Sequence, residues 1–345
     1  MQILKDFKDW TNFRMRIMTG LYYLFLLVVC STVSFGQQLK KKKIEFKISN
    51  GLQIAGVDVT NPVIYDNDLV IDTPDVFFIW LKANKGEVNL VGNISTRDMY
   101  GLPDYKYEHD FLFSQWTDLY DRALKSQLKN IPAPVKGADM TLVKPANGII
   151  EDTKYKSSVG SDLIIAQAHK ASPEKPLCIF AGGNVTTIAN AYLKDKSIAD
   201  KIVVFHVDGY KFNEGTYNTM DSWSAYVVMK RFRYISWSGD LYSWYHKVRP
   251  LNVDLTGMPV NPFTEVIKYW YGAAYAEWKD VGDAPPILYF FDHSLWKNVV
   301  FKNEDRDGSP NSYDFLLVSE NDWPGYGRNL SDVIRNPSNY KSQAK

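Results

Sequence analysis

The sequence predicts an α/β fold in which helices cover both faces of one central, mostly parallel sheet. Three observations support this prediction. Short apolar runs recur without the alternating polar positions of a half-exposed strand. Segments with helical spacing of apolar residues separate these runs, as crossovers between parallel strands require. Polar clusters follow three of the runs, and such sheets bind ligands beyond the carboxyl ends of their strands.

The first strand is expected at 62–65, where PVIY is apolar throughout and carboxylates follow. A helix then begins near Thr73 and Pro74, because Thr is a good N-cap and Pro is favoured at the first helical position. The next apolar run predicts a strand at 88–92, and a long helix is expected at 111–128.

Strands and helices continue to alternate through the second half of the chain. Apolar runs predict the strands, and apolar residues at helical spacing predict the helices. In order, the expected elements are strand 177–181, helix 188–193, strand 202–207, helix 226–230, strand 234–237, the aromatic helix 263–278 and strand 287–291.

The composition is that of a globular chain of 345 residues, of which 45% are hydrophobic and 23% are charged. The formal net charge of +1 gives no reason to expect a nucleic-acid partner. No internal repeat or low-complexity linker marks a domain boundary. We therefore expect residues 37–345 to form a single large domain, with a loop-rich C-terminal part that contains many Asp, Asn, Pro and Gly residues.

Residues 1–36 are predicted to be a signal peptide region. Basic residues precede the apolar run 21–29, which is too short to span a bilayer comfortably, and small residues follow it up to Gly36. We expect export to the periplasm or outside the cell, cleavage near Gly36 and no stable membrane insertion afterwards. A lipoprotein anchored at Cys30 is less favoured, because the preceding residue is not small. The mature chain then keeps Cys178 alone, in a run typical of a buried strand, and we expect an inert core thiol there.

Four carboxylates crowd the segment after the first strand, at Asp66, Asp68, Asp72 and Asp75. Asp66 and Asp68 are two residues apart, so in a strand they face the same side. Such a group repels itself unless a cation or a helix N-terminus offsets the charge. A helix start accounts for Asp75 together with Thr73. A hard, oxygen-seeking cation, Ca²⁺ or Mg²⁺, explains the other three carboxylates better.

These residues resemble a known signature. The run Asp66-x-Asp68-x-x-x-Asp72 after a buried strand resembles the Asp-x-Asp-x-x-x-Asp-Asp signature of the inosine–uridine nucleoside hydrolases. Weaker similarities follow in the family's order over roughly residues 60–300. They lie in the second strand and its loop at 91–96, in the segments 131–138, 183–189 and 202–209, in the stretch with Asn218, Asp221 and Ala225, and at Asp292.

The resemblance implies a hydrolase that cleaves N-glycosidic bonds of ribonucleosides, or of a related glycoside, with a Ca²⁺-bound water. Asp68 would bind Ca²⁺ and act as the general base, and Asp72 and Asn218 would contact the sugar. Other residues implied at the metal site are Thr186, through its backbone carbonyl, Asp292, as a ligand, and Asp66, in support. The expected partner is a small sugar or nucleoside. The family's tendency to form dimers and tetramers leaves a homo-oligomer open.

Departures from the family pattern keep an alternative open. Thr73 stands where the signature has its last Asp, normally a strong metal ligand, and Asp75 is the candidate substitute. Phe291 precedes Asp292 where the family has a His that helps the leaving base depart. A non-catalytic sugar-binding protein on the same scaffold, or a structural protein, is the alternative. His206 has no partner at metal-ligand spacing, so we expect it in the core or at the surface.

Overall fold

The structure is a computed structural model, and it describes residues 54, 56–68, 73–97, 109–207, 221–237, 265, 287 and 312–314. All of these residues belong to the compact unit Phe46–Lys345, and none belongs to the N-terminal unit Met1–Glu45. The expected signal peptide at 1–36 therefore lies outside the described residues. None of the helices that the structure describes is long and apolar enough to cross a membrane.

Seven described strands form one sheet in the order β3-β2-β1-β4-β5-β6-β7, and every neighbouring pair is parallel. This arrangement confirms the predicted α/β fold with a central parallel sheet. The strands are β1 (Pro62–Asn67), β2 (Asn89–Ser95), β3 (Pro134–Lys136), β4 (Leu177–Ala181), β5 (Ile202–Val207), β6 (Arg233–Trp237) and β7 (Ser312–Asp314).

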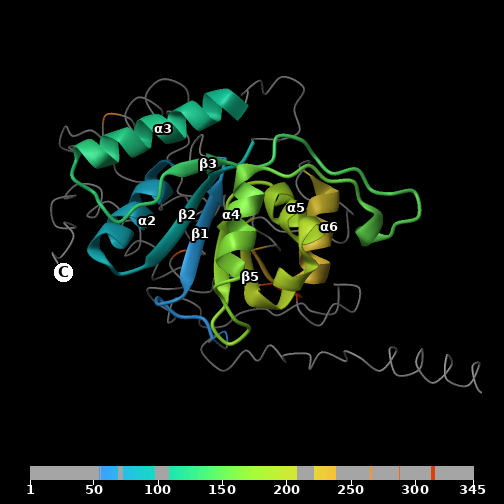
Figure 1. Ribbon diagram of the computed structural model, residues 1–345. Helices are drawn as coiled ribbons and strands as arrows, with labels where there is room; N and C mark the ends of the chain where they lie inside the picture. The colour runs from blue at the N-terminus through green and yellow to red at the C-terminus, as the bar shows by residue number, and fades with distance from the viewer. Residues whose placement is uncertain are drawn as a thin grey trace, which may run out of the picture. The chain divides into compact units, whose positions relative to one another are not determined.

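Helices connect the strands and pack against the sheet. Figure 1 shows α4, α5 and α6 side by side, and α4 and α6 each contact α5. The helices α2 and α3 contact β2, and α3 also contacts β3. The helical segments are α2 (Thr73–Lys85), α3 (His109–Lys125), α4 (Val159–Ala168), α5 (Thr186–Lys194), α6 (Ser222–Arg231) and the 3₁₀ turns η1 (Ile150–Asp152) and η2 (Lys196–Lys201).

Successive residues of β1 face the two helix layers in turn. Tyr65 packs against Trp116 of α3, with ring centroids 6.2 Å apart. The following residue, Asp66, pairs in register with Ile94 of β2. Ile94 packs so closely on α4 that a Cβ atom at Gly160 would lie 3.0 Å from its Cγ2 atom. Because side chains alternate along a strand, Asp66 faces the layer of α4, α5 and α6.

Most of the sequence-based elements are confirmed within the described residues. The expected strands correspond to β1, β2, β4, β5 and β6, and the expected helices to α2, α3, α5 and α6. The strands β3 and β7 and the helix α4 were not predicted from the sequence. The late run 287–291 was expected to be a strand, but Ile287, the described part of it, is helical. Periodicity cannot distinguish a short buried strand from a buried helical segment. The expected helix 263–278 is described only at residue 265, which is helical.

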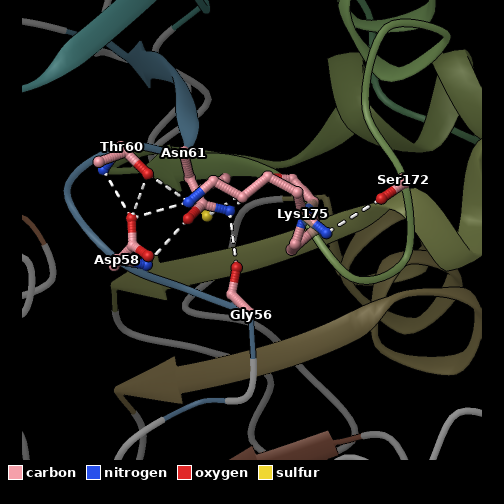
Figure 2. Close-up of polar contacts among 8 residues, drawn as sticks. Gly56, Asp58, Thr60, Asn61, Ser172 and Lys175 are labelled. Carbon is pink, nitrogen blue, oxygen red and sulfur yellow. Dashed lines mark hydrogen bonds and ion pairs between the residues drawn. The ribbon is translucent and has the colours of Figure 1, made fainter.

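Polar contacts join the segments that precede β1 and β4, at the amino ends of these strands (Figure 2). The Asn61 amide donates to the backbone oxygens of Gly56 and Pro176, at 2.9 and 2.7 Å. Lys175 forms an ion pair with Asp58, with 2.8 Å between Nζ and Oδ1. Together these contacts hold the amino ends of the two central strands next to each other.

Candidate functional site

The strand order reverses between β1 and β4. The chain proceeds from β1 to β2 and β3 on one side, and from β4 to β5 and β6 on the other. Open α/β sheets bind ligands beyond the carboxyl ends of their strands at such a point. Here Asp66 lies within the end of β1, Asp68 follows that strand, and Gly182 and Gly183 follow β4. The structure thus places Asp66 and Asp68 at the carboxyl end of β1, where the sequence predicts polar groups.

Asp68 lies between the segments that follow β2 and β4. A Cβ atom at Gly183 would lie 3.1 Å from Asp68 Oδ2 and 3.0 Å from Thr96 Cγ2. The absence of a side chain at Gly183 therefore lets the β4–α5 turn approach the carboxylate closely. Asp68 is 8% exposed, whereas Thr96 is fully buried. The Thr96 hydroxyl has no hydrogen-bond partner within the described part of the chain.

Asp66 is fully buried, two residues before Asp68. Its register partners are Ile94 and Ala181, and neither carboxylate oxygen has a hydrogen-bond partner among the described residues. Burial raises the pKa of Asp66 well above its usual range, because water no longer solvates the charged form. A buried, unpartnered carboxylate is costly unless a proton or a cation neutralises it. Either neutralisation, by a proton or by a nearby cation, fits the surroundings of Asp66.

Asp75 is fully buried in the first turn of α2, which begins at Thr73 as the sequence predicts. A carboxylate there interacts favourably with the helix dipole, in agreement with the helix-start interpretation. Its role as a metal ligand stays a prediction. Asp72, Asn218 and Asp292 lie outside the described residues. Within those residues no cluster of three His, Cys, Asp or Glu side chains is arranged to hold a metal.

Thr186 is the first residue of α5 and is fully buried. Its hydroxyl donates to Asp221 Oδ2 at 2.8 Å. Asp221 is the N-cap of α6, and it also accepts from the backbone N–H groups of Ser224, at 2.9 Å, and Leu142, at 2.6 Å. Burial raises the pKa of Asp221, and these hydrogen bonds partly offset the rise. The side chain of Thr186 thus joins two helices, and its carbonyl as a metal ligand stays a prediction.

His206 lies in the core, as one of the two sequence alternatives expects, and it is fully buried on β5. Its Nε2 atom lies 3.0 Å from the Gly183 carbonyl oxygen, and its Nδ1 atom lies 2.6 Å from the Tyr234 hydroxyl. A carbonyl oxygen only accepts hydrogen bonds, so Nε2 carries the proton. In the neutral ring Nδ1 then accepts from Tyr234. His206 therefore links β6 to the turn beside Asp68, a role that residue spacing does not reveal.

A second group of contacts joins the segments that follow β2, β3 and β4. Arg97 donates to the backbone oxygen of Asp139 at 2.9 Å, and the Asn184 amide donates to the backbone oxygen of Arg97 at 2.5 Å. His109, at the start of α3, contacts the Ser95 carbonyl oxygen at 2.8 Å. Burial lowers the pKa of His109. The sequence reading assigned no role to Arg97 or His109, because neither belongs to a pattern with a known spacing.

Cys178 is a free, fully buried thiol on β4. Burial raises its pKa, so the reactive thiolate form is disfavoured. This placement confirms the predicted core thiol.

No protein-family model matches the chain, and no curated protein matches it by sequence. Solved structures do match. A plant nucleoside hydrolase has a TM-score of 0.53 and 15% sequence identity, over 80% of this chain and 98% of that one. An inosine–guanosine nucleoside hydrolase has a TM-score of 0.53 and 14% identity, over 79% and 98% of the two chains. A purine-preferring ribonucleoside hydrolase from Gardnerella vaginalis has a TM-score of 0.51 and 16% identity, over 80% and 99%.

These similarities show that the chain has a nucleoside hydrolase-like α/β fold. At such low identity they show the fold alone, because one fold carries many activities. The expectation of the inosine–uridine family is thus confirmed at the level of the fold, and not at the level of the specific family.

Proposed function

We propose that the protein hydrolyses the N-glycosidic bond of ribonucleosides or of a related glycoside. The observation that carries this proposal is the position of Asp68. Asp68 follows the carboxyl end of the central strand β1, at the reversal of strand order, with 8% of its surface exposed, and the fully buried Asp66 lies two residues before it. Three of the similar structures are named as nucleoside hydrolases, which supports the substrate class.

Hydrolysis of an N-glycosidic bond requires a general base for the attacking water and negatively charged groups near the sugar. Cleavage of an N-glycosidic bond passes through an oxocarbenium-like state, which nearby carboxylates stabilise. In the proposal Asp68 takes the proton from the attacking water as general base. Asp72 and Asn218 hydrogen-bond the sugar hydroxyls.

A Ca²⁺ ion is the proposed cofactor. When bound, it would supply positive charge that holds the water and the vicinal hydroxyls of the sugar. The residues proposed to hold it are Asp68, the carbonyl of Thr186, Asp292, and Asp75 in place of the ligand lost at position 73, with Asp66 in support. The carboxylate of Asp66 is buried and has no hydrogen-bond partner among the described residues, which supports this proposal, because a nearby cation would offset its charge.

A non-catalytic sugar-binding protein is the second candidate function. Two positions favour it, since Thr73 replaces an expected metal ligand and Phe291 replaces an expected His. Such a protein would keep measurable affinity for the sugar and show no hydrolysis. Under both functions the ligand is a small molecule, and we propose that the chain meets it after export and cleavage near Gly36.

The test uses the mature chain from Gln37 with nucleosides and aryl ribosides, with Ca²⁺ and after chelation. We expect turnover that Asp68→Ala and Asp68→Asn abolish without changing the thermal unfolding midpoint by more than a few degrees. Asp162→Asn is the matched control, because this exposed carboxylate on α4 pairs with Lys194 at the surface. Sugar binding without hydrolysis in the wild type would overturn the enzyme proposal and favour the binding protein.

A further inference from the structure

A series of hydrogen-bonded groups connects β6 and β5 to the turn after β4, beside the candidate site. Tyr234 lies on β6, His206 on β5, and Gly183 in the turn after β4. Tyr234 pairs in register with Val204, two residues before His206, so both rings face the same side of the sheet. The two rings meet edge-on, with centroids 5.7 Å apart.

The two hydrogen bonds of this series run in the same direction, from Tyr234 through His206 to Gly183. The Tyr234 hydroxyl donates to His206 Nδ1, and His206 Nε2 donates to the Gly183 carbonyl oxygen, at 2.6 and 3.0 Å. All of these groups are buried. The low dielectric of the interior strengthens such bonds, and water cannot replace them. The two hydrogen bonds therefore fix the position of the Gly183 carbonyl.

A displacement of the β4–α5 turn would change the position of the Asp68 carboxylate. Gly183 approaches Asp68 so closely that even a Cβ atom would lie 3.1 Å from Oδ2 and 3.2 Å from Cγ. The turn and the carboxylate are therefore close neighbours, with no room for a side chain between them. The position of the turn limits the positions that the Asp68 carboxylate can adopt.

We propose that Tyr234 and His206 form a positioning pair that holds the β4–α5 turn against Asp68 and so orients this carboxylate. Neither residue acts on the substrate itself. The catalytic consequence rests on the proposed function, whereas the structural consequence does not.

The first measurement is hydrogen exchange of the backbone amides at 182–187 in the ligand-free mature chain. We expect His206→Leu, which loses both hydrogen bonds, to speed exchange there at least tenfold. His206→Gln is the conservative variant, because its side-chain N–H can reach the same carbonyl, and we expect most of the protection to return. Tyr234→Phe removes one hydroxyl and should give an intermediate effect.

The control is Tyr192→Phe. It also removes a hydrogen-bonded hydroxyl from a buried ring, here bound to Glu151 at 3.0 Å, but it lies in the last turn of α5, away from the β4–α5 turn. We expect it to leave exchange at 182–187 unchanged. Unchanged exchange in a folded His206→Leu would overturn the positioning role. If His206→Leu does not fold, Tyr234→Phe is the test of the proposal. Exchange at 182–187 as slow in Tyr234→Phe as in the wild type would then overturn it.

The second measurement separates positioning from general stability. In a chain that hydrolyses ribosides, we expect His206→Leu to lower kcat about tenfold to a hundredfold with little change in KM, since small displacements of a catalytic group have effects of this size. His206→Gln should recover most of kcat. A rise in KM alone would contradict the proposal. If the wild type shows no turnover, the proposed function is wrong. The exchange measurement would still test whether Tyr234 and His206 hold the turn in place.

Discussion

The Thr186 hydroxyl donates to Asp221 Oδ2 at 2.8 Å, and this buried hydrogen bond joins the first residue of α5 to the N-cap of α6. Because the same carboxylate also accepts from Leu142 N, it connects both helices to the loop after β3. The amino ends of two helices near the candidate site are thus fixed by one side chain.

Asp221→Ala should therefore lower the free energy of unfolding by about 2–4 kcal/mol, because an N-cap is lost and buried donors are left without an acceptor. Denaturant unfolding measures this change. Ser158→Ala is the matched control, since Ser158 caps α4 in a partly buried position and should cost about 1 kcal/mol. Equal losses in the two variants would contradict the connecting role of Asp221.

Gly183→Ala should reduce sugar or nucleoside binding, because the added methyl group would press on Asp68 and Thr96. We expect at least a tenfold weaker affinity by calorimetry, and a loss of about 1–3 kcal/mol in stability from overpacking. Gly86→Ala is the control. Gly86 has φ +81° and open space around its Cα, so that variant costs about 1–2 kcal/mol in backbone strain and leaves ligand affinity unchanged.

Calcium should stabilise the mature chain. At a free concentration one hundred times its dissociation constant, a ligand that binds only the folded state adds about 2.7 kcal/mol. We expect this increase to disappear in Asp68→Ala and to persist in Asp162→Asn, as measured by thermal unfolding with calcium and with chelator. An identical calcium response in wild type and Asp68→Ala would exclude Asp68 as a ligand.

The ion pair between Asp58 and Lys175 should make stability depend on acid pH. The Lys175 ammonium, with help from Thr60, lowers the pKa of Asp58 from 3.8 to about 2. A lowered folded-state pKa means that the pair stabilises the fold above pH 3.8 and that this contribution is lost as pH falls toward 2. Lys175→Met should therefore lose less stability than wild type between pH 4 and 2. The difference will be small because both side chains are exposed, and salt should reduce it further.

The sequence predicted the central strands well because buried parallel strands are continuous apolar runs. It ended β1 at Tyr65, whereas the strand continues through Asp66 and Asn67. Polar residues usually end such a run, and here they remain in the strand because Asp66 and Asn67 continue the pairing with Ile94 and Ser95 of β2. The strand β3 was missed because it has only three residues and begins with a proline. The helix α4 was missed although Ser158 and Ser161 form a capping box at its start.

The candidate site was predictable in part. The sequence places Asp66 and Asp68 directly after the apolar run of β1, and the structure has Asp66 in the last part of that strand and Asp68 just beyond it. The contact of His206 with Gly183 was not predictable, because it depends on which strands become neighbours. For the same reason Asp221 looked like part of a sequence motif, and its role as a helix cap emerged only from the fold.

The polar contacts around Asn61 and Lys175 lie at the opposite end of β1 from Asp68, roughly 20 Å away at the usual rise of a strand. The contacts that align the central strands and the candidate site therefore lie at different ends of the same strands. Mutations near Asp68 can be selected for a new ligand while the amino-end contacts keep the central strands aligned. A library that varies the carboxyl-end turns and conserves the amino-end residues should yield mostly folded variants, which makes this chain a practical starting point for altering specificity.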